Sequence, residues 1–433
     1  MVNKDDLYVI ESEKNKIVFD AESMMIFSFP KHLDKNSIYN KIKDKYNTIK
    51  EKDKLQTSGI VKMHEIKHKI ESVNLTLNVS QTCNLSCTYC LVESDYNNPM
   101  MMKDSVVEDT LKYFLKKFPN INSITFYGGE PLLNFGLIKK TIELCKKTGL
   151  KDVKYNIVSN GTICNQELIE LIKDNDIAIS VSIDGPQEIH DKHRVFKDGS
   201  GSFKKVVKTI ERLMQNGVNP YLIAVYTIEH KRMGMSTVAL YDYLCENFEK
   251  LPVNIVPEQR AFSLGEQVRC IKPLMEYYIT SFLKERSRFR LKGIDQDIST
   301  LGRRKKLVHV CPGGIDNFFI DAEGNIYPCQ GFGLYKDFIL GKVSNNKPLL
   351  EDIPNEFLNL KNNEKCRRCW IRNLCNFCPA ACYDKTGKLV PDEEYCNANR
   401  EYFERMIMLL GDIFSDEDKM RIFAKNYLNK GEK

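Results

Sequence analysis

The sequence predicts an α/β protein built around a parallel sheet, either an open sheet or part of a barrel. Two observations carry this prediction. Six short apolar runs alternate with longer amphipathic segments, and glycines stand where the helices should end. A small domain precedes this region, and a loop-rich, cysteine-rich region follows it. At 433 residues, the chain is long enough for several domains.

Residues 1–70 are predicted to form the small first domain. The stretch LYVIESEKNKIVFDAESMMIFSF indicates short strands joined by tight turns. SIYNKIKDKYNTIKEKDK indicates a helix with a solvated, Lys-rich face. The charged end of this helix, followed by Gly59, suits a linker.

Six predicted strands define the central region. Gly149 and Gly217 are placed to end helices, and SVVEDTLKYFLKKF and LIKKTIELCKKTG are amphipathic segments between strands. Parallel sheets of this kind bind ligands at the carboxyl ends of their strands, so the residues just after each strand are candidate site residues. The strands are predicted at residues 73–79, 123–127, 153–159, 177–183, 221–227 and 253–257.

The chain is expected to be cytosolic. Its N-terminus, MVNKDDLYVI, has no apolar signal core, and its longest charge-free run, Leu75 to Val92, is too polar to span a membrane. The 64 basic and 58 acidic residues are well mixed, which favours a solvated surface over an anionic partner. Neither a membrane nor a nucleic acid is expected as a partner.

Fifteen cysteines are many for a cytosolic chain, where disulfides are disfavoured. Four are scattered and are expected to be small buried apolar residues: Cys145, Cys164, Cys245 and Cys270. The other eleven fall into two clusters, which indicates metal or redox chemistry.

The first cluster lies in VSQTCNLSCTYCLV, just past the first central strand. Cys83, Cys87 and Cys90 can hold three irons of a four-iron cluster and leave the fourth without a protein ligand. A catalytic metal keeps such an open position. Taken alone, this spacing could also belong to a zinc site.

The array resembles the signature of radical S-adenosylmethionine (SAM) enzymes, in which SAM chelates the open iron. FYGGEPLLNF, SNGT and SIDGPQEIHDKHR follow the next three strands and match further segments of that family. The resemblance covers about residues 73–285 and implies a partial (β/α)6 TIM-like barrel. It implies that SAM contacts Tyr89, Gly128, Gly129, Glu130, Ser159, Asn160, Ser182 and Arg194. Asp184, His190 and His193 lie in the same region, where they either act in the site or stabilise its loop.

The second cluster begins near a predicted hairpin, FFIDAEGNIYPC, whose turn is Glu323-Gly324-Asn325. Its spacing resembles the SPASM extension of peptide-modifying radical SAM enzymes, which usually holds two further [4Fe–4S] clusters. The resemblance assigns the distal cluster to Cys366, Cys369, Cys375 and Cys396. Cys311 and Cys329 belong to the nearer one, and Cys378, Cys382 or both complete it. Zinc is the alternative for these cysteines.

The two resemblances imply a division of the chain. A leader-recognition domain covers residues 1–70, and the radical SAM core covers 71–285. A bridging segment covers 286–310, the SPASM domain 311–405 and a helical tail 406–433.

The implied chemistry begins when one electron enters the open cluster and SAM is cleaved. The resulting 5′-deoxyadenosyl radical takes one hydrogen atom from the substrate. Joining a carbon to a thiol sulfur is a two-electron oxidation, so a second electron needs an acceptor, which an auxiliary cluster offers. No general base is identifiable in the sequence.

The substrate is expected to be a Cys-containing ribosomal precursor peptide. The first domain resembles the winged-helix-like element that binds a precursor's leader as an added strand. The expected enzyme is therefore a thioether-forming maturase of sactipeptide or ranthipeptide type, with flavodoxin or ferredoxin as electron donor.

Several alternatives remain open. Sulfatase maturases resemble the chain, but Gln330 stands where they carry a basic aspartate. A maturase that forms C–C crosslinks, or one that trims a tyrosine-bearing precursor, would share the barrel and clusters. A zinc-bearing nucleic-acid module is a remote alternative.

Overall fold

The computed structural model describes residues 4–49, 70–91, 100–150, 152–248, 251–284, 291–307, 309–345 and 347–428. The predicted linker at Gly59 and part of the bridging segment lie outside these ranges. The chain divides into two compact units. One unit contains Lys62–Ala261 and Cys311–Leu358, and the other contains Met1–Val61, Phe262–Val310 and Asn359–Lys433. The domain boundaries predicted from the sequence stay predictions.

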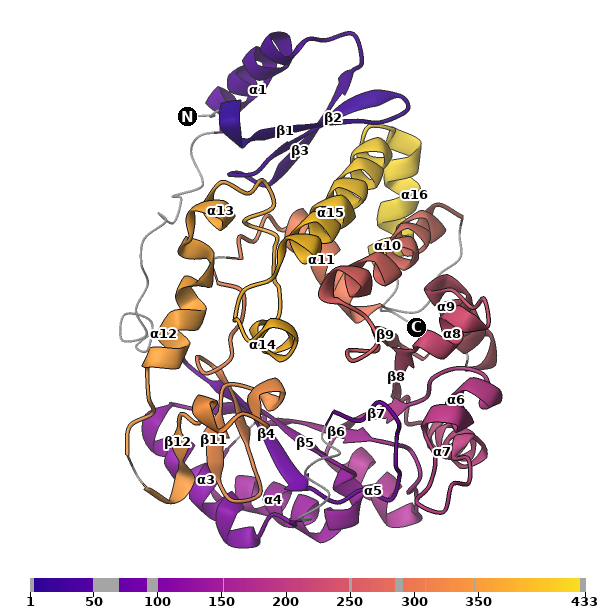
Figure 1. Cartoon of the computed structure of the whole chain (residues 1–433), viewed down its shortest axis with the longest axis vertical. Helices are drawn as coiled ribbons and strands as arrows, with labels where there is room; N and C mark the ends of the chain where they lie inside the picture. The colour runs from indigo at the N-terminus through magenta and orange to yellow at the C-terminus, as the bar shows by residue number, and fades with distance from the viewer. Residues whose placement is uncertain are drawn as a thin grey trace. The chain divides into compact units, whose positions relative to one another are not determined.

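The first unit contains the six predicted strands, which form one parallel series in chain order and confirm the α/β prediction (Figure 1). Register pairs such as Leu75 with Ile124 align neighbouring strands. The strands are β4 (Val73–Ser80), β5 (Ile121–Gly128), β6 (Lys154–Ser159), β7 (Ala178–Ser182), β8 (Tyr221–Tyr226) and β9 (Val253–Pro257). That they curve into a partial barrel stays a prediction.

Helices alternate with these strands because each connecting segment carries an apolar stripe. In α7, for example, Val206, Ile210 and Leu213 recur at helical spacing and are buried. Gly149 and Gly217 follow α4 and α7 with φ of +77° and +76°, which confirms the predicted helix ends. The helices are α3 (Asp104–Lys117), η3 (Pro131–Asn134), α4 (Phe135–Lys147), α5 (Gln166–Asp174), α6 (Gln187–His193), α7 (Phe203–Gln215), α8 (Ile228–Arg232) and α9 (Thr237–Asn247).

The predicted hairpin is confirmed, and it also extends the sheet. β10 (Asn317–Ile320) pairs antiparallel with β11 (Asn325–Tyr327) and parallel with β4. β11 in turn pairs with β12 (Gly341–Lys342). Gly324 closes the turn with φ of +82°. The same unit contains η5 (Gln330–Phe332), η6 (Lys336–Phe338), η7 (Val343–Asn345) and most of α12 (Asp352–Asn359).

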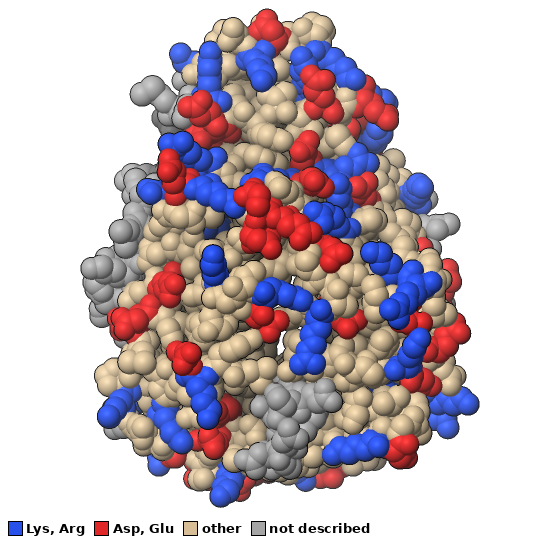
Figure 2. Space-filling view, viewed as in Figure 1, with Lys and Arg blue, Asp and Glu red and all other residues tan. Residues whose placement is uncertain are grey.

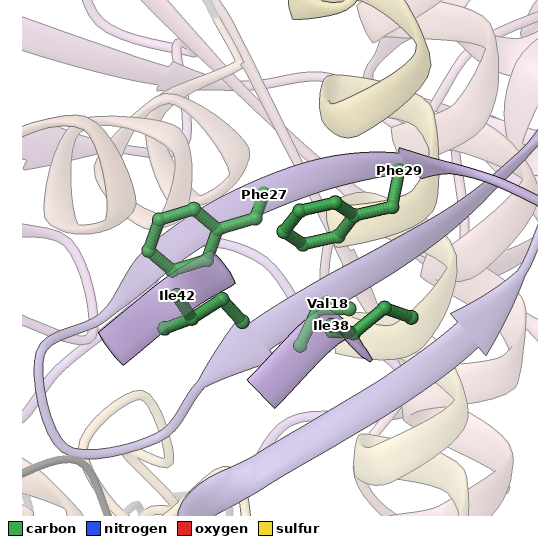
Figure 3. Close-up of a cluster of buried hydrophobic side chains, with 5 residues drawn as sticks. All are labelled: Val18, Phe27, Phe29, Ile38 and Ile42. Atoms are coloured by element: carbon green, nitrogen blue, oxygen red, sulfur yellow. The ribbon is translucent and has the colours of Figure 1, made fainter. Parts of the chain in front are cut away.

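In the other unit, the predicted short N-terminal strands are confirmed as an antiparallel sheet of order β1-β2-β3. They are preceded by η1 (Lys4–Asp6), and they are β1 (Leu7–Glu11), β2 (Asn15–Asp20) and β3 (Met25–Pro30). The predicted helix is confirmed as α1 (Lys35–Ile49). It packs on one face of the sheet through the buried side chains Val18, Phe27, Phe29, Ile38 and Ile42 (Figure 3). The likeness to a winged helix stays a prediction.

The opposite face of the N-terminal sheet packs on the long helix α15 (Glu393–Phe414). A Cβ on Gly411 of α15 would lie 2.6 Å from Ile17 Cγ2 of β2, so the two elements are in close contact. The Ser12 hydroxyl donates to the Asp412 carboxylate at 2.8 Å. The unit also contains α10 (Leu264–Ser281), η4 (Phe282–Lys284), α11 (Lys292–Gly302), η8 (Leu360–Asn362), α13 (Glu364–Arg367), α14 (Pro379–Thr386) and α16 (Glu417–Leu428).

Acidic and basic side chains are interspersed on the face shown in Figure 2, in line with the mixed charges of the sequence. Within the ranges that the structure describes, no helix combines the length and apolar character needed to cross a membrane.

Candidate functional site

The three-thiol loop follows β4 directly. Cys83 is buried, and Cys87 and Cys90 are half-buried. The Leu85 amide donates to Cys83 Sγ at 3.4 Å. Burial raises the pKa of Cys87 to about 12, so this thiol needs a nearby cation before it can act as a thiolate ligand.

The segment after α6 holds this loop in place. The Ser86 amide donates to the Val195 carbonyl at 2.8 Å, and the Thr88 amide donates to the His193 carbonyl at 3.1 Å. The loop is therefore fixed by main-chain hydrogen bonds, and Arg194 is brought beside it.

Gly128 and Gly129 let the end of β5 lie against the start of the same loop. A Cβ on Gly128 would lie 2.1 Å from the Ser80 oxygen, and a Cβ on Gly129 would lie 2.5 Å from the Thr82 oxygen. The Gly129 amide donates to the Ser80 carbonyl at 2.7 Å. The two glycines are thus needed for close packing against the backbone of Ser80 and Thr82. That they also contact SAM stays a prediction.

Glu130 is fully buried and ties the end of β5 to the end of β6. Its carboxylate accepts from the Leu132 amide at 3.1 Å, the Ser159 hydroxyl at 3.0 Å and the Asn160 amide at 2.7 Å. Burial raises the pKa of Glu130 to about 7, although the three hydrogen bonds act in the opposite direction. Three protein donors already occupy this carboxylate, and its contact with the SAM amino group stays a prediction.

Asn160 joins the β6 end to the three-thiol loop. Its Nδ2 donates to Asn84 Oδ1 at 2.8 Å and to Cys83 Sγ at 3.5 Å. Ser182 lies at the end of β7 and is half-buried. Direct contacts of Ser159, Asn160 and Ser182 with SAM stay predictions.

Asp184, just past β7, joins three elements through one buried carboxylate. Oδ2 accepts from Arg194 Nε at 2.9 Å and from the Tyr89 hydroxyl, and Oδ1 accepts from the Val225 amide at 2.9 Å. The Arg194 guanidinium also lies over the Tyr89 ring, 5.4 Å from its centroid. Burial alone would raise the pKa of Asp184, but Arg194 outweighs it and the pKa is lowered.

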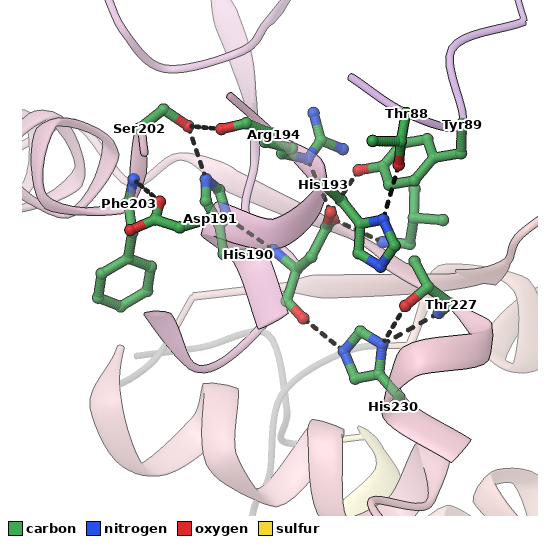
Figure 4. Close-up of polar contacts among 12 residues, drawn as sticks. Thr88, Tyr89, His190, Asp191, His193, Arg194, Ser202, Phe203, Thr227 and His230 are labelled. Carbon is green, nitrogen blue, oxygen red and sulfur yellow. Dashed lines mark hydrogen bonds and ion pairs between the residues drawn. The ribbon is translucent and has the colours of Figure 1, made fainter. Parts of the chain in front are cut away.

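Two histidines, His190 and His230, hydrogen-bond to the main chain of Asp184. Both rings are labelled in Figure 4. The Asp184 amide donates to His190 Nδ1 at 3.2 Å, and His230 Nε2 donates to the Asp184 carbonyl at 2.7 Å. The Thr227 amide donates to His230 Nδ1 at 3.0 Å. A ring nitrogen that accepts from an amide carries no proton, so both rings are neutral. Burial lowers the pKa of His190 to about 4. Asp184 and His190 thus stabilise the loop, one of the two roles considered for them.

His193 faces the three-thiol loop. Its Nδ1 lies 2.7 Å from the Thr88 hydroxyl oxygen. Its Nε2 is buried and has no hydrogen-bond partner among the residues that the structure describes.

In the other unit, four cysteines line one pocket: Cys366, Cys369, Cys375 and Cys396. They are the four that the sequence assigns to the distal auxiliary cluster. Four thiols around one pocket are the donor set of a four-iron cluster, so these residues fit that group. Within the described ranges, no three Cys, His, Asp or Glu side chains converge closely enough to hold a single metal ion.

The same pocket is lined by four basic residues: Lys361, Lys365, Arg372 and Arg400. Burial lowers the pKa of Lys361 to about 8, although the nearby thiols of Cys375 and Cys366 oppose this. None of the four was predicted from the sequence as a pocket residue, because a segment rich in Lys and Arg is typical of a solvated surface.

The remaining cysteines of the second cluster lie in both units. Cys311 accepts from the Gly313 amide at 3.3 Å, and Cys329 follows β11. In the other unit, Cys378 precedes α14 and is exposed, whereas Cys382 lies within α14 and is buried. Their roles as cluster ligands stay predictions.

The four scattered cysteines differ in burial. Cys145 and Cys245 are buried as predicted. The prediction is wrong for Cys164 and Cys270, which are half-buried. Cys164 lies in the loop before α5, and Cys270 lies on α10, where only one face of the helix is covered.

Residues 77–232 match the Radical SAM superfamily. The three-thiol loop, the Gly-Gly-Glu segment and Arg194 all lie in this range. The chain therefore belongs to the radical SAM superfamily, and membership implies SAM and a [4Fe–4S] cluster as cofactors.

The relatives that resemble the chain include a sulfatase-maturating enzyme, an uncharacterized protein and a cyclopropyl synthase. A cysteine-type anaerobic sulfatase-maturating enzyme of Clostridium novyi (strain NT) is 26% identical over 360 residues, or 76% of this chain and 94% of that enzyme. An uncharacterized protein of Methanocaldococcus jannaschii is 30% identical over 263 residues, or 59% of this chain and 84% of that protein. The radical SAM cyclopropyl synthase TigE of Paramaledivibacter caminithermalis is 23% identical over 434 residues, or 91% of this chain and 88% of that enzyme.

Two solved structures share the fold. Native anSMEcpe with bound AdoMet and Cp18Cys peptide has a TM-score of 0.65 at 24% identity, over 79% of this chain and 99% of that one. Streptococcus suis SuiB bound to precursor peptide SuiA has a TM-score of 0.54 at 15% identity, over 90% of this chain and 98% of that one.

Proposed function

We propose that this radical SAM enzyme modifies a ribosomally made, Cys-containing precursor peptide and joins a cysteine sulfur to carbon. The observation that carries the proposal is the pairing of two thiol sets. One is the three-thiol loop after β4, and the other is the pocket lined by four thiols.

The loop residues are proposed to bind the first cluster and SAM. Cys83, Cys87 and Cys90 would hold a [4Fe–4S] cluster, which supplies an electron for the cleavage of SAM when bound. Asp184 fixes Arg194 through Nε, so the Nη groups of Arg194 are proposed to bind the SAM carboxylate. Tyr89 packs beneath this guanidinium and keeps it oriented.

The second pocket supports an oxidative reaction. The substrate carbon loses one hydrogen atom, the cysteine thiol loses one proton, and one further electron leaves the substrate as the C–S bond forms. That electron needs an acceptor, which we assign to the auxiliary centres. Cys366, Cys369, Cys375 and Cys396 would hold the distal one, and Cys311 and Cys329, with Cys378, Cys382 or both, the nearer one.

The N-terminal sheet supports a peptide partner. Among the residues that the structure describes, β1 and β3 each pair with one neighbour, β2, so we propose that an extended leader adds to an edge of this sheet through main-chain hydrogen bonds. anSMEcpe and SuiB were both solved with a bound peptide. The electron donor is proposed to be a flavodoxin or a ferredoxin.

Formation of C–C bonds in a peptide is the second candidate. It is favoured by the similarity to the cyclopropyl synthase TigE, which extends over 91% of the chain. A sulfatase-maturase-like activity is disfavoured because Gln330 cannot accept a proton.

The test is anaerobic incubation of the reconstituted enzyme with SAM, dithionite and a Cys-containing peptide encoded beside its gene. After reduction of any disulfide, a peptide that is two hydrogen atoms lighter and no longer reacts with iodoacetamide carries a C–S bond. The same mass loss with a free thiol means a C–C bond. Cys87→Ala should abolish SAM cleavage, whereas Cys164→Ala, outside both thiol sets, should leave it intact. If the wild-type enzyme does not cleave SAM, the proposal is wrong.

A further inference from the structure

Lys361 is a buried cation in the wall of the four-thiol pocket. It lies in η8, its residue is 9% exposed, and it lines the pocket with Cys366, Cys369, Cys375 and Cys396. Its Nζ donates to the Leu307 carbonyl at 2.8 Å and to the Arg372 carbonyl at 2.8 Å. These hydrogen bonds fix the position of the ammonium group, but neither carbonyl neutralises its charge.

The other basic residues of the pocket differ in this respect. Glu393 pairs with both Lys365 and Arg400 at 2.6 Å. Arg372 pairs with Asp6 at 2.9 Å and with Glu22 at 3.2 Å. All three are therefore bound to carboxylates, whereas Lys361 donates to two uncharged main-chain carbonyls.

A buried charge is costly unless an opposite charge lies nearby. A four-iron cluster with four thiolate ligands carries a net negative charge, and its potential responds to nearby charge. The four thiols place that negative charge in the same pocket as Lys361. The pocket is thus built to hold an anion beside a fixed cation.

We propose that Lys361 tunes the distal auxiliary cluster by raising its reduction potential. This inference rests on the proposed function, which places the cluster here. On reduction, the cluster gains one electron and no atom is transferred. In the proposed reaction, that electron would leave the substrate as the C–S bond forms. A fixed ammonium favours the more negative, reduced state, so it makes this cluster a better electron acceptor.

The test is a potential titration of the reconstituted full chain, followed by electron paramagnetic resonance. The distal signal is the one that Cys366→Ala removes. Lys361→Gln keeps a donor for the two carbonyls but removes the charge. We expect the equilibrium constant for reduction to fall about tenfold, a shift of about 59 mV to lower potential for one electron. Lys361→Arg should stay near the wild-type potential.

Lys306→Gln is the matched control. Lys306 lies next to Leu307, pairs with Glu22 at 2.5 Å and is not among the residues that line the pocket. The substitution removes the same charge from the same unit, and we expect the potential to stay near the wild-type value. Equal potentials in Lys361→Gln and Lys306→Gln would overturn the proposal.

If Lys361→Gln does not load the cluster, its potential cannot be measured, and the iron contents of the Lys361 variants are compared instead. If Lys361→Arg loads it and Lys361→Gln does not, the charge is required and the proposal is supported. If both fail, Lys361 acts through packing and the proposal is wrong. If the wild type shows no signal that Cys366→Ala removes, the proposal of a distal auxiliary cluster is wrong, and the role of Lys361 is wrong as well. A signal that is present but insensitive to Lys361→Gln overturns only the role of Lys361.

Discussion

Trp370 stacks face to face on Tyr8, with ring centroids 4.0 Å apart and an interplanar angle of 3°. Trp370 directly follows Cys369, and Tyr8 lies in β1, so the pair joins the cysteine segment to the N-terminal sheet. Arg372 adds ion pairs with Asp6 and Glu22 on the same side.

The stack predicts an energetic coupling between the two rings. In a double-mutant cycle of Tyr8→Leu and Trp370→Leu, we expect a coupling energy of about 1 kcal/mol in chemical unfolding. Phe27 packs on α1 from the opposite face of the sheet and provides the control. Its cycle with Trp370 should give less than about 0.5 kcal/mol. Equal values in the two cycles would contradict the contact.

Gly128→Ala should prevent the three-thiol loop from docking. The new Cβ would lie 2.1 Å from the Ser80 oxygen, at a φ of +141° that side chains rarely adopt. With the three proposed clusters loaded, the wild type holds about twelve irons, and we expect the variant to lose about four of them, because this loop carries the thiols proposed for the SAM-binding cluster. Gly136→Ala is the control, because an added Cβ there has no described atom within 4 Å apart from its chain neighbours and the backbone of its own helix. Full iron content in Gly128→Ala would show that the close approach is not required.

Asp184→Asn should leave the Arg194 guanidinium buried without its counter-charge. Breaking a buried pair by removing one partner costs about 3–5 kcal/mol. We expect a lower unfolding midpoint together with weaker SAM binding, measured by calorimetry. Asp198→Asn, in an exposed loop nearby, should change stability by no more than about 0.5 kcal/mol. Equal effects of the two substitutions would rule out the buried pair as the cause.

His190 should make the protein less stable in mild acid. Its pKa is lowered from 6.5 to about 4 by burial, so its contribution is present above pH 6.5 and is lost as pH falls toward 4. Between pH 7 and pH 5 the loss should be roughly 2 kcal/mol. His190→Gln cannot titrate in this range, so its unfolding free energy should fall by less. Parallel pH curves for the two proteins would sink this prediction.

The features predicted correctly from the sequence are those that depend on local residue patterns. The six parallel strands are short apolar runs flanked by glycines and amphipathic helices, and all six are confirmed. The four-thiol pocket gathers the cysteines that spacing and family resemblance had grouped. Contacts between distant segments were not predictable. No local sequence pattern indicates that β10 pairs with β4. None indicates that the Glu130 carboxylate accepts hydrogen bonds from Ser159 and Asn160.

The burial of some charged residues was also not predicted, for a physical reason. Lys361 and Asp184 belong to residue types that usually lie at the surface, so only their surroundings reveal their burial. Trp370 is the only tryptophan of the chain, and its stacking partner Tyr8 is 362 residues earlier in the sequence.

The packing of the N-terminal sheet on α15 has a consequence for biosynthesis. Ser12 and Asp412 are 400 residues apart, so the ribosome completes β1, β2 and β3 long before it makes the helix that covers them. Until then, the apolar side chains of β2 that face α15 are open to water or to a chaperone. Contacts of such long sequence separation form slowly. A nascent chain stalled before residue 393 would expose this face and be a target for proteolysis.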